Sequence, residues 1–526
     1  MNTKRLLVVP LCILALTCSL FGQGTQETTQ TAEKKEALTP ISLWYGALMT
    51  EAGPPPADWA GYQIIRDKLG IELTLTALPS NENDQDVKIQ AAGAANNLPD
   101  IFQVTRAPWL RMVKQGLIAP VDDMYAKMPV RTKQQYTDAS IKFTTYNGHS
   151  YGLASPGSIV RNEGLVIRKD WLDKLGLAVP KTIDELLAVM HAFTYDDPDG
   201  NGANDTYGYG AFLELNNREE GLGRRLDPIF GAYGVAGTWN LTEKDFGLNV
   251  RKPAYYDAMS TVMKMVEDNV IDPNWLSYRK DDFRAAWKQG RFGIMREQNG
   301  ALAMESNYKP FDTNFPNGEW IVIDPPAGPS GDSAVGVYSA AYRIFAVSEK
   351  AAKEGKKDAI ARLLEWMSSN EGYYLLGWGV KGVNYTLDEN GIPSDKNLPN
   401  PDLAYTKPLG RPVIQLANMV YIYSDAELKA TFPNYKSANG KTMSALTVLR
   451  EMQGKNWVDA TGIDAMPLPS ADLKRFYEQG VAEFVAGKNK LNPENWAAFI
   501  AKFDELGGKQ WEADGLTYAK ENGLLK

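Results

Sequence analysis

Alternating oxygen-bearing side chains in one short loop carry the clearest coordination chemistry in the sequence. They stand at positions 1, 3, 5 and 9 of the loop and are Asp197, Asp199, Asn201 and Asp205. Gly202 at position 6 permits a sharp turn, and Ala203 at position 7 offers its carbonyl oxygen. Hard cations bind oxygen ligands with this spacing, and a flexible loop suits Ca²⁺. The spacing therefore predicts a structural calcium site.

The loop departs from the EF-hand form at position 12, where Gly208 replaces the usual bidentate Glu. Thr206 or water would then complete the coordination. A solvated turn is the alternative, because Asp, Asn and Gly are common turn residues that need no ion. Mutual repulsion of four carboxylates favours the cation. Those carboxylates belong to Asp196, Asp197, Asp199 and Asp205.

A predicted helix precedes the loop and would hold it in place. Thr182 can cap the helix N-terminus, and Glu185 can reach back to the free backbone donor, as in a capping box. Four apolar residues recur on one face of this helix, so we expect that face to be buried. They are Leu186, Val189, Met190 and Phe193.

Strands and helices alternate nearer the N-terminus. Strands are expected at residues 41–44, 71–76 and 101–104, with helices ending at Gly70 and Ala95 between them. This βαβαβ pattern predicts an open α/β sheet, in which ligands bind at the carboxyl ends of the strands. The aromatic residues expected there, beside a cleft, are Trp44, Tyr45 and Trp109.

The run at residues 165–208 and four shorter segments resemble one known family. The segments are TYNGHSYGL at 145–153, DNVIDPNW at 268–275, GRFGIM at 290–295 and GVKGVNYTLDENGIP at 379–393. In this order they resemble the family 1 extracellular solute-binding lipoproteins of ABC transporters. Within that family they are most similar to the large oligosaccharide-binding type, which includes the alginate-binding proteins. The resemblance implies an α/β, two-lobed, periplasmic-binding-protein-like type II fold with a hinge between the lobes.

The resemblance also implies that each lobe is built from separate parts of the chain. We expect an N-terminal lobe from residues 39–160 and 337–400, and a C-terminal lobe from residues 161–336 and 401–526. The lobes would rotate when they close on a ligand. The expected hinge residues are 158–164 and 336–345.

The N-terminus has the form of an export signal. Lys4 and Arg5 precede an apolar run at residues 6–16, which is shorter than the roughly 20 residues of a membrane span. We predict a lipoprotein signal peptide and lipobox at residues 1–18, with Cys18 as the lipidated residue. The protein would then be an exported lipoprotein of the cell membrane that faces the periplasm or the exterior.

Ordinary cleavage near Gly22 or Gly24, which would release a soluble protein, is the alternative to lipidation. Residues 23–38 are polar, and residues 19–38 are expected to form a flexible tether. The only other cysteine is Cys12, also in the leader, so the mature chain has no disulfide and no thiol chemistry.

Composition and motifs exclude several classes of function. The net charge of −8 argues against nucleic acid or an anionic membrane surface as a partner. The chain has only two histidines, His149 and His191, and contains no P-loop motif. An acidic pair for glycoside hydrolysis remains open, because such pairs form in space and the chain has 64 acidic residues.

The 13 Trp and 25 Tyr residues suit a sugar ligand, whose C–H faces stack on aromatic rings. Trp239 and Trp378 stand in Gly-rich loops and either face the cleft or pack in the core. Three polar residues are further candidates. Arg161 and Tyr338 lie in the expected crossovers, and Glu297 follows the GRFGIM segment.

The sequence thus predicts a binding protein without a reaction of its own. Its lobes would close on a carbohydrate, an oligosaccharide by resemblance, and deliver it to the permease subunits of an ABC transporter. We expect a monomer. A lipid-anchored carbohydrate-active enzyme, either a hydrolase or a lyase, is the alternative, and an adhesin without a small ligand is a third class.

Overall fold

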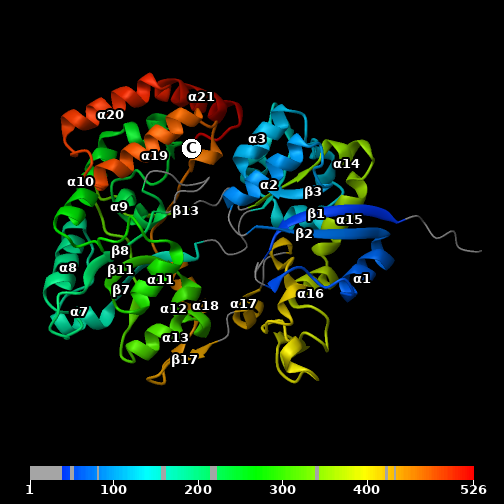
Figure 1. Cartoon of the computed structure of the whole chain (residues 1–526), viewed down its shortest axis with the longest axis horizontal. Coiled ribbons are helices and arrows are strands. Elements are labelled where there is room, and N and C mark those ends of the chain that lie inside the picture. Colours follow the sequence, from blue (N-terminus) through cyan, green and yellow to red (C-terminus); the bar gives the residue numbers. More distant parts are fainter. Residues whose placement is uncertain are drawn as a thin grey trace, which may run out of the picture. The chain divides into compact units, whose positions relative to one another are not determined.

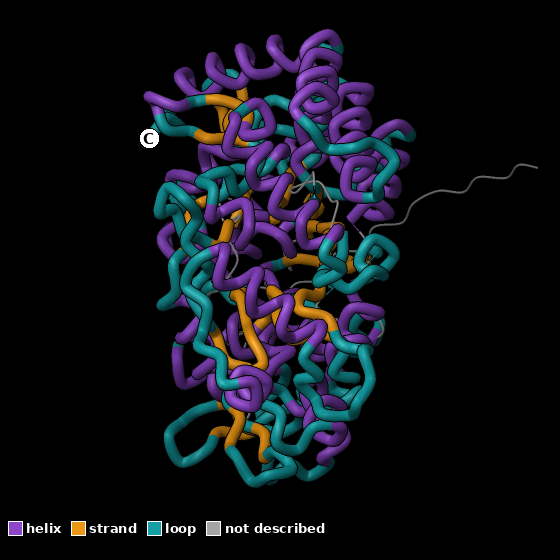
Figure 2. The backbone as a smooth tube through the Cα atoms, turned by 90° about the vertical axis from the view of Figure 1, so that its left-hand side faces the viewer, coloured by secondary structure: helices purple, strands orange, loops and turns teal. Residues whose placement is uncertain are grey.

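The computed structural model describes residues 38–47, 52–79, 82–155, 161–213, 222–337, 343–420, 424–431 and 434–526. The predictions for the leader, the tether, Cys18 and Tyr338 lie outside these residues. Helices and loops surround the strands (Figure 2). Among the described helices, none combines the length and the apolar composition that a membrane span requires.

A five-stranded sheet forms the centre of the N-terminal lobe. Its order is β2 (Ile71–Leu78), β1 (Thr39–Gly46), β3 (Ile101–Val104), β14 (Arg343–Val347) and β6 (Leu153–Ser155). Strand β1 pairs in parallel with β2 and β3, whereas β14 is antiparallel to β3 and β6. The predicted βαβαβ order is confirmed, and the distant strand β14 completes the sheet.

Helices pack on both faces of this sheet. One face meets α1 (Ala60–Leu69), α15 (Lys357–Met367) and α16 (Asn370–Trp378), and the other meets α2 (Glu82–Ala94) and α3 (Arg106–Lys114) (Figure 1). Gly70 ends α1 in the left-handed conformation, with φ of 63°. Shorter helices complete the lobe. They are α4 (Asp122–Tyr125), α5 (Pro129–Gln135), α6 (Asp138–Phe143) and α14 (Glu349–Lys353).

Residues 405–420 pack into the core of the N-terminal lobe. The segment contains the 3₁₀ turns Arg411–Ile414 and Ala417–Met419. Tyr405 and Ile414 belong to the same buried cluster as the strand β1 and the helix α16. Residues 401–526 were expected in the C-terminal lobe, but apolar side chains hold residues 405–420 on the other core.

A four-stranded sheet forms the centre of the C-terminal lobe. Its order is β12 (Trp320–Val322), β7 (Glu163–Arg168), β11 (Phe292–Gln298) and β8 (Tyr207–Gly210). The predicted capped helix is α8 (Ile183–Tyr195), which packs in the core beside β8 and β11. Its capping box is confirmed, because the Glu185 backbone N–H donates to Thr182 Oγ1 at 3.2 Å and the Glu185 carboxylate accepts from the Thr182 N–H at 3.3 Å.

The remaining helices of this lobe come from both halves of the chain. They are α7 (Lys169–Leu175), α9 (Asp227–Ala232), α10 (Pro253–Glu267), α11 (Lys280–Lys288), α12 (Asn299–Ala303), α13 (Glu305–Asn314), α18 (Ala445–Gln453), α19 (Ala471–Val485), α20 (Pro493–Glu505) and α21 (Gly508–Glu521). A separate helix, α17, spans Asp425–Thr431. The strand β13 (Val335–Val337) pairs in parallel with β19 (Trp457–Asp459), so the last part of the chain returns to the expected second crossover.

Candidate functional site

Polar side chains gather at the carboxyl ends of the N-terminal strands. Gln103 accepts a hydrogen bond from the Gly46 N–H at 3.2 Å and donates to Gln85 at 3.2 Å. The Lys88 ammonium lies 4.9 Å from the centre of the half-buried Trp44 ring. Trp44 therefore stands beside a polar edge, as open α/β sheets place their ligand sites.

Tyr45 and Trp109 do not line a cleft, and the prediction for these two residues is wrong. Side chains alternate along a strand, so Tyr45 shares the buried face of β1 with Ile41 and Leu43. Burial, with a smaller contribution from Tyr62, raises the pKa of the Tyr45 phenol to about 12. Trp109 is fully buried in α3 and its indole N–H donates to the Tyr151 carbonyl at 3.1 Å.

Trp239 and Trp378 are core residues, so the expectation that their rings face a ligand is also wrong. Trp239 is 2% exposed and makes an edge contact with Trp511, with ring centres 5.1 Å apart. Trp378 is 1% exposed and makes an edge contact with Tyr405 at 4.9 Å. The Gly-rich loops bring other chain segments close to each ring instead of leaving it open to solvent.

Arg161 lies beside an exposed tryptophan that the sequence analysis missed. Its guanidinium carbon is 4.0 Å from the centre of the Trp457 ring, and its Nη1 donates to the Gln453 carbonyl at 3.3 Å. Arg161 has a left-handed backbone, with φ of 55°, which is uncommon outside glycine and often marks a functional position. The Trp457 side chain is 39% exposed in β19. These two residues place an aromatic face and a cation together where the chain enters the C-terminal lobe.

Glu297 is a structural residue rather than a ligand contact. Its side chain is fully buried, and its carboxylate accepts hydrogen bonds from Arg284 Nε at 3.0 Å and Nη2 at 2.9 Å. Glu297 lies in β11, of which only the last residue, Gln298, is not buried. The carboxylate is therefore committed to Arg284, which was not among the predicted site residues.

A buried ionic network lies next to the entry strand β7. Glu163 forms ion pairs with Arg296 at 3.3 Å and Arg225 at 3.6 Å, and Arg296 also pairs with Asp227 at 3.1 Å. Burial alone would raise the pKa of Glu163, but Arg225, Arg224 and Arg296 outweigh it and hold the pKa far below its ordinary value. Arg296 also donates to the Gly336 carbonyl at 2.9 Å. The network thus joins β7 and β11 to β13.

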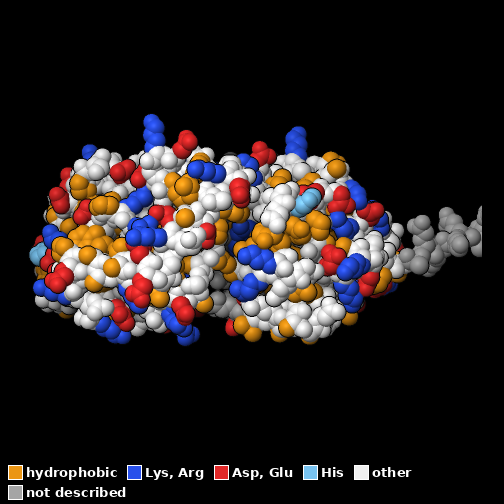
Figure 3. Space-filling view, turned by 90° about the horizontal axis from the view of Figure 1, so that it is seen from above, with side chains coloured by type: hydrophobic (Ala, Val, Ile, Leu, Met, Phe, Trp, Pro, Cys, Tyr) orange, Lys and Arg blue, Asp and Glu red, His pale blue; other side chains and the backbone are white. Residues whose placement is uncertain are grey.

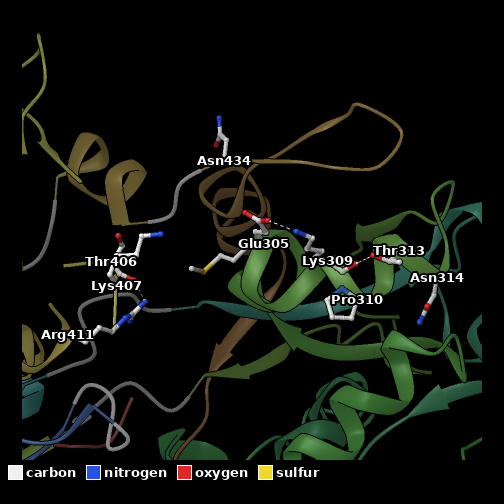
Figure 4. Close-up of a pocket in the computed structure, with 10 residues that line it drawn as sticks. Glu305, Lys309, Pro310, Thr313, Asn314, Thr406, Lys407, Arg411 and Asn434 are labelled. Atoms are coloured by element: carbon white, nitrogen blue, oxygen red, sulfur yellow. Dashed lines mark hydrogen bonds and ion pairs between the residues drawn. The ribbon is translucent and has the colours of Figure 1, made fainter. Parts of the chain in front are cut away.

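A cavity of about 880 Å³ has walls from both lobes (Figure 4). The C-terminal lobe contributes side chains of α13 and the residue before it, which are Met304, Glu305, Lys309, Pro310, Thr313 and Asn314. Thr406, Lys407 and Arg411 line it from the segment that packs on the N-terminal core, together with Asn434. Most of these side chains are polar, so the cavity offers hydrogen bonds and charge to a hydrophilic ligand.

The acidic loop after α8 is folded around its own side chains. The Asp197 carboxylate accepts hydrogen bonds from the backbone N–H groups of Gly200, Asn201 and Gly202 at 2.9–3.1 Å. The Asn201 amide Nδ2 donates to Asp199 at 2.9 Å and to both carboxylate oxygens of Asp205 at 3.2 Å. The amide N–H group of Asn201 thus lies among carboxylates that would also attract a cation.

The structure of the loop contradicts one predicted metal ligand, Thr206. Thr206 is buried, and its hydroxyl donates to the Phe193 carbonyl at 2.9 Å, so it is held away from the exposed carboxylates. Burial and the neighbouring Asp197 and Asp205 raise the pKa of Asp199. Within the described ranges, no three His, Cys, Asp or Glu side chains are arranged to hold a metal ion.

Comparison with known proteins identifies the family. The pattern of the family called "Bacterial extracellular solute-binding protein" matches residues 46–374, which is more than half of the chain. The chain belongs to this family. The match runs through strands of both sheets, so the family assignment rests on both lobes of this solute-binding protein.

Individual relatives of this solute-binding protein agree with the assignment. The polygalacturonan/rhamnogalacturonan-binding protein YtcQ of Bacillus subtilis is 27% identical over 402 residues, which cover 74% of this chain and 75% of YtcQ. The solved structure of the Streptococcus pneumoniae substrate-binding protein FusA with kestose has a TM-score of 0.66 at 18% identity, covering 93% of this chain and 100% of FusA.

Two further structures have similar folds. A FusA EF-hand mutant with fructo-nystose has a TM-score of 0.65 at 17% identity, covering 93% of this chain and 100% of that chain. The alginate-binding protein AlgQ2 without calcium ion has a TM-score of 0.64 at 15% identity, covering 92% and 98%. The predicted two-lobed α/β fold of this solute-binding protein is confirmed, as is its likeness to the alginate-binding type.

Proposed function

We propose that this protein is the carbohydrate-binding component of an ABC transporter, and that it captures an oligosaccharide between its lobes and delivers it to the permease. The family match over residues 46–374 carries this proposal. The names of two relatives support the class of ligand, because YtcQ binds polygalacturonan and FusA was solved with kestose. The polar cavity between the lobes offers the hydrogen bonds that sugar hydroxyls require.

Trp457 and Arg161 are the proposed stacking site. A sugar presents C–H groups to an aromatic face and hydroxyl groups to nearby donors, and Trp457 offers the face while Arg161 offers N–H groups. Trp44 beside Lys88 is the second aromatic candidate, at the carboxyl edge of the N-terminal sheet. Trp44 and Trp457 are at least partly exposed, in contrast to the buried Trp239 and Trp378.

Closure would occur by rotation about residues 158–164 and 336–345, of which residues 158–160 and 338–342 lie outside the described part of the chain. The Glu163 network supports this choice, because it anchors the described ends of both segments to one rigid sheet. Hinge closure on a ligand is the common motion of two-lobed binders. An identical radius of gyration with and without a tight ligand would contradict it.

A structural calcium ion is proposed for the loop after α8. The side chains of Asp197, Asp199, Asn201 and Asp205 and the carbonyl of Ala203 would hold it. Rotation of the Asn201 amide would exchange its N–H group for an oxygen ligand, and the carboxylates already converge on that amide. The name of one structure of similar fold, a FusA EF-hand mutant, supports this proposal, because it implies an EF-hand in that protein.

Export and anchoring are proposed from the leader and the family. The family is extracellular, and one relative, LipO of Bacillus subtilis, is named a lipoprotein. Cys18 would carry the lipid, so Cys18→Ala should release the protein from the membrane fraction. Wild-type protein that is already found in the soluble fraction, with no change in Cys18→Ala, would favour the ordinary cleavage site.

A titration against oligosaccharides tests the function. The mature protein should bind at least one member of a panel of tri- to pentasaccharides, as measured by thermal shift and calorimetry. The bound sugar should be recovered unchanged after long incubation, because a transporter component does not act on its cargo. Product formation would instead support the hydrolase or lyase alternative, and no response to any sugar would favour the adhesin.

A further inference from the structure

The ionic side chains that line the cavity between α13 and residues 406–411 are mainly cationic. Lys309, Lys407 and Arg411 are the cations, and Glu305 is the only carboxylate among the lining residues. The whole chain has the opposite balance, with a net charge of −8. Charges of both signs are interspersed on the face shown in Figure 3. The positive balance is therefore a property of this cavity and not of the protein surface in general.

Two of the three cations have no counter-charge among the residues that the structure describes. Glu305 is already engaged with Lys309 at 2.9 Å on the C-terminal side of the cavity. On the other side, no carboxylate in the described part of the chain lies within ion-pair distance of Lys407 or Arg411. Arg411 Nη2 donates to the Thr406 carbonyl at 3.3 Å, which leaves the charge of the guanidinium uncompensated. Two neighbouring cations repel each other, and an anion placed between them relieves that repulsion.

The lining of an adjoining pocket along α13 also contains more cations than carboxylates. The pocket measures about 400 Å³, shares Pro310 and Asn314 with the first cavity, and is also lined by Arg284 and Lys288. Burial lowers the pKa of Lys288, and the positive charge of Arg284 lowers it further. Arg284 and Lys288 thus contribute two cations to this lining against the single carboxylate of Asp281, although Arg284 is already paired with Glu297.

We propose that the cavity between α13 and residues 406–411 binds a carboxylate of an acidic oligosaccharide, so that the ligand of this protein contains uronic acid. Lys407 and Arg411 would pair with the carboxylate, while Thr313 and Asn434 would meet sugar hydroxyls (Figure 4). The volume falls within the range of about 300–1,000 Å³ that is usual for ligand pockets. This inference rests on the proposed function, since it assigns a chemical class to the sugar.

The position of the cations also links the anion to closure. Lys309 belongs to one lobe, and Lys407 and Arg411 pack with the other. A carboxylate that contacts both walls is bound more tightly when the walls are close together, so it shifts the lobes toward that arrangement. A neutral sugar lacks this contribution to closure.

Matched acidic and neutral sugars test the inference. The probes are linear oligouronates and the corresponding neutral oligosaccharides, obtained by reducing each carboxylate to a primary alcohol, with calorimetry on the mature protein. At least one oligouronate should bind about tenfold or more tightly than its reduced form, as expected for a charge-assisted hydrogen bond. The preference should decrease as salt concentration rises.

Variants locate the site. The double variant Lys407→Gln/Arg411→Gln should lose most of the preference for the oligouronate and keep its affinity for the neutral form. Lys133→Gln, which removes an exposed lysine of α5 without an ion pair among the described residues, is the matched control and should keep the preference. Equal affinity for acidic and neutral forms, or an unchanged preference in the double variant, would overturn the inference while leaving carbohydrate binding intact. Failure of every sugar to bind would overturn the proposed function itself.

Discussion

Arg106 and Tyr518, which are 412 residues apart in the sequence, are joined by a hydrogen bond of 2.8 Å from the guanidinium Nη2 to the phenol oxygen. Arg106 begins α3 of the N-terminal lobe, and Tyr518 lies in α21, the last helix of the C-terminal lobe. The guanidinium is buried and stacks on the rings of Trp109 and Phe143 at 4.7 and 4.6 Å. Because its position is fixed by these rings, the bond to Tyr518 is a defined contact between the lobes.

Tyr518→Phe should loosen this contact without disturbing either core. The variant removes one partner of a charge-assisted hydrogen bond, which contributes about 1.5–3 kcal/mol. Amide hydrogen exchange should therefore become faster in α3 as well as in α21. Tyr195→Phe is the control, because its hydroxyl bonds within one lobe to the Asp268 carbonyl at 2.9 Å. Unchanged exchange in α3 of Tyr518→Phe would show that the bond does not hold the lobes together.

Trp457→Ala should weaken sugar binding with little effect on stability. A stacked aromatic ring contributes about 0.5–1.5 kcal/mol beyond the area it covers, so affinity should fall by roughly tenfold. The side chain is 39% exposed, and exposed substitutions usually change stability by less than about 0.5 kcal/mol. Calorimetry with a bound oligosaccharide and a melting curve measure the two effects. Unchanged affinity would remove Trp457 from the site.

Trp239→Ala should have the opposite profile. Its ring packs against Trp511 and Phe246, and Gly515 of α21 leaves just enough room for it, since a Cβ there would lie 2.4 Å from the ring. Removing a buried Trp costs about 3–5 kcal/mol. We therefore expect a large loss in denaturant midpoint and an unchanged sugar affinity in the protein that remains folded. A stable variant with weakened binding would contradict the core assignment.

The contrast between Trp457 and Trp239 shows which features sequence patterns can predict and which they cannot. Local features could be predicted because they depend on residues that are close in the sequence. Examples are the capping box of Thr182 and Glu185 in α8 and the alternation in β2. The exposure of Trp457 depends instead on the pairing of β19 with β13, whose residues are more than 100 positions away. Its polar context in NWVD was the only signal, and it is too common to be decisive.

Long-range packing also explains the remaining errors. Glu297 follows a conspicuous segment, but only the folded sheet shows that its carboxylate belongs to Arg284. Residues 405–420 carry no pattern that selects one lobe, and they join the N-terminal core through apolar contacts with α16. The cations Lys407 and Arg411 were missed for the same reason, since their cavity forms only where two distant segments meet.

Calcium removal should destabilise the protein if the loop after α8 holds the ion. A ligand that binds only the folded state stabilises it by about 2.7 kcal/mol at one hundred times its dissociation constant, so a chelator should lower the melting temperature. Ca²⁺ should restore it better than Mg²⁺, which demands a smaller and stricter octahedron. Asp199→Ala should abolish the chelator effect and leave sugar specificity intact. A variant that responds to chelator like the wild type would place any ion elsewhere.

Glu163→Gln should destabilise the protein most at neutral pH. The folded-state pKa of Glu163 lies below the unfolded value of about 4.3, because the surrounding arginines outweigh the effect of burial. The stabilisation is therefore complete above the unfolded pKa and is lost as pH falls through the acidic range toward the folded pKa. Breaking a buried ion pair on one side costs about 3–5 kcal/mol, since it removes the carboxylate charge that faces Arg225 and Arg296.

Urea unfolding at pH 7 and pH 3 measures the effect. The wild type should lose stability between these values, and the difference between wild type and Glu163→Gln should be smaller at pH 3. Glu72→Gln is the control, because its ion pair with Arg66 at 2.6 Å is exposed to solvent and should contribute little at either pH. An equal difference at both pH values would mean that Glu163 stabilises the fold by its shape and hydrogen bonds, not by its charge.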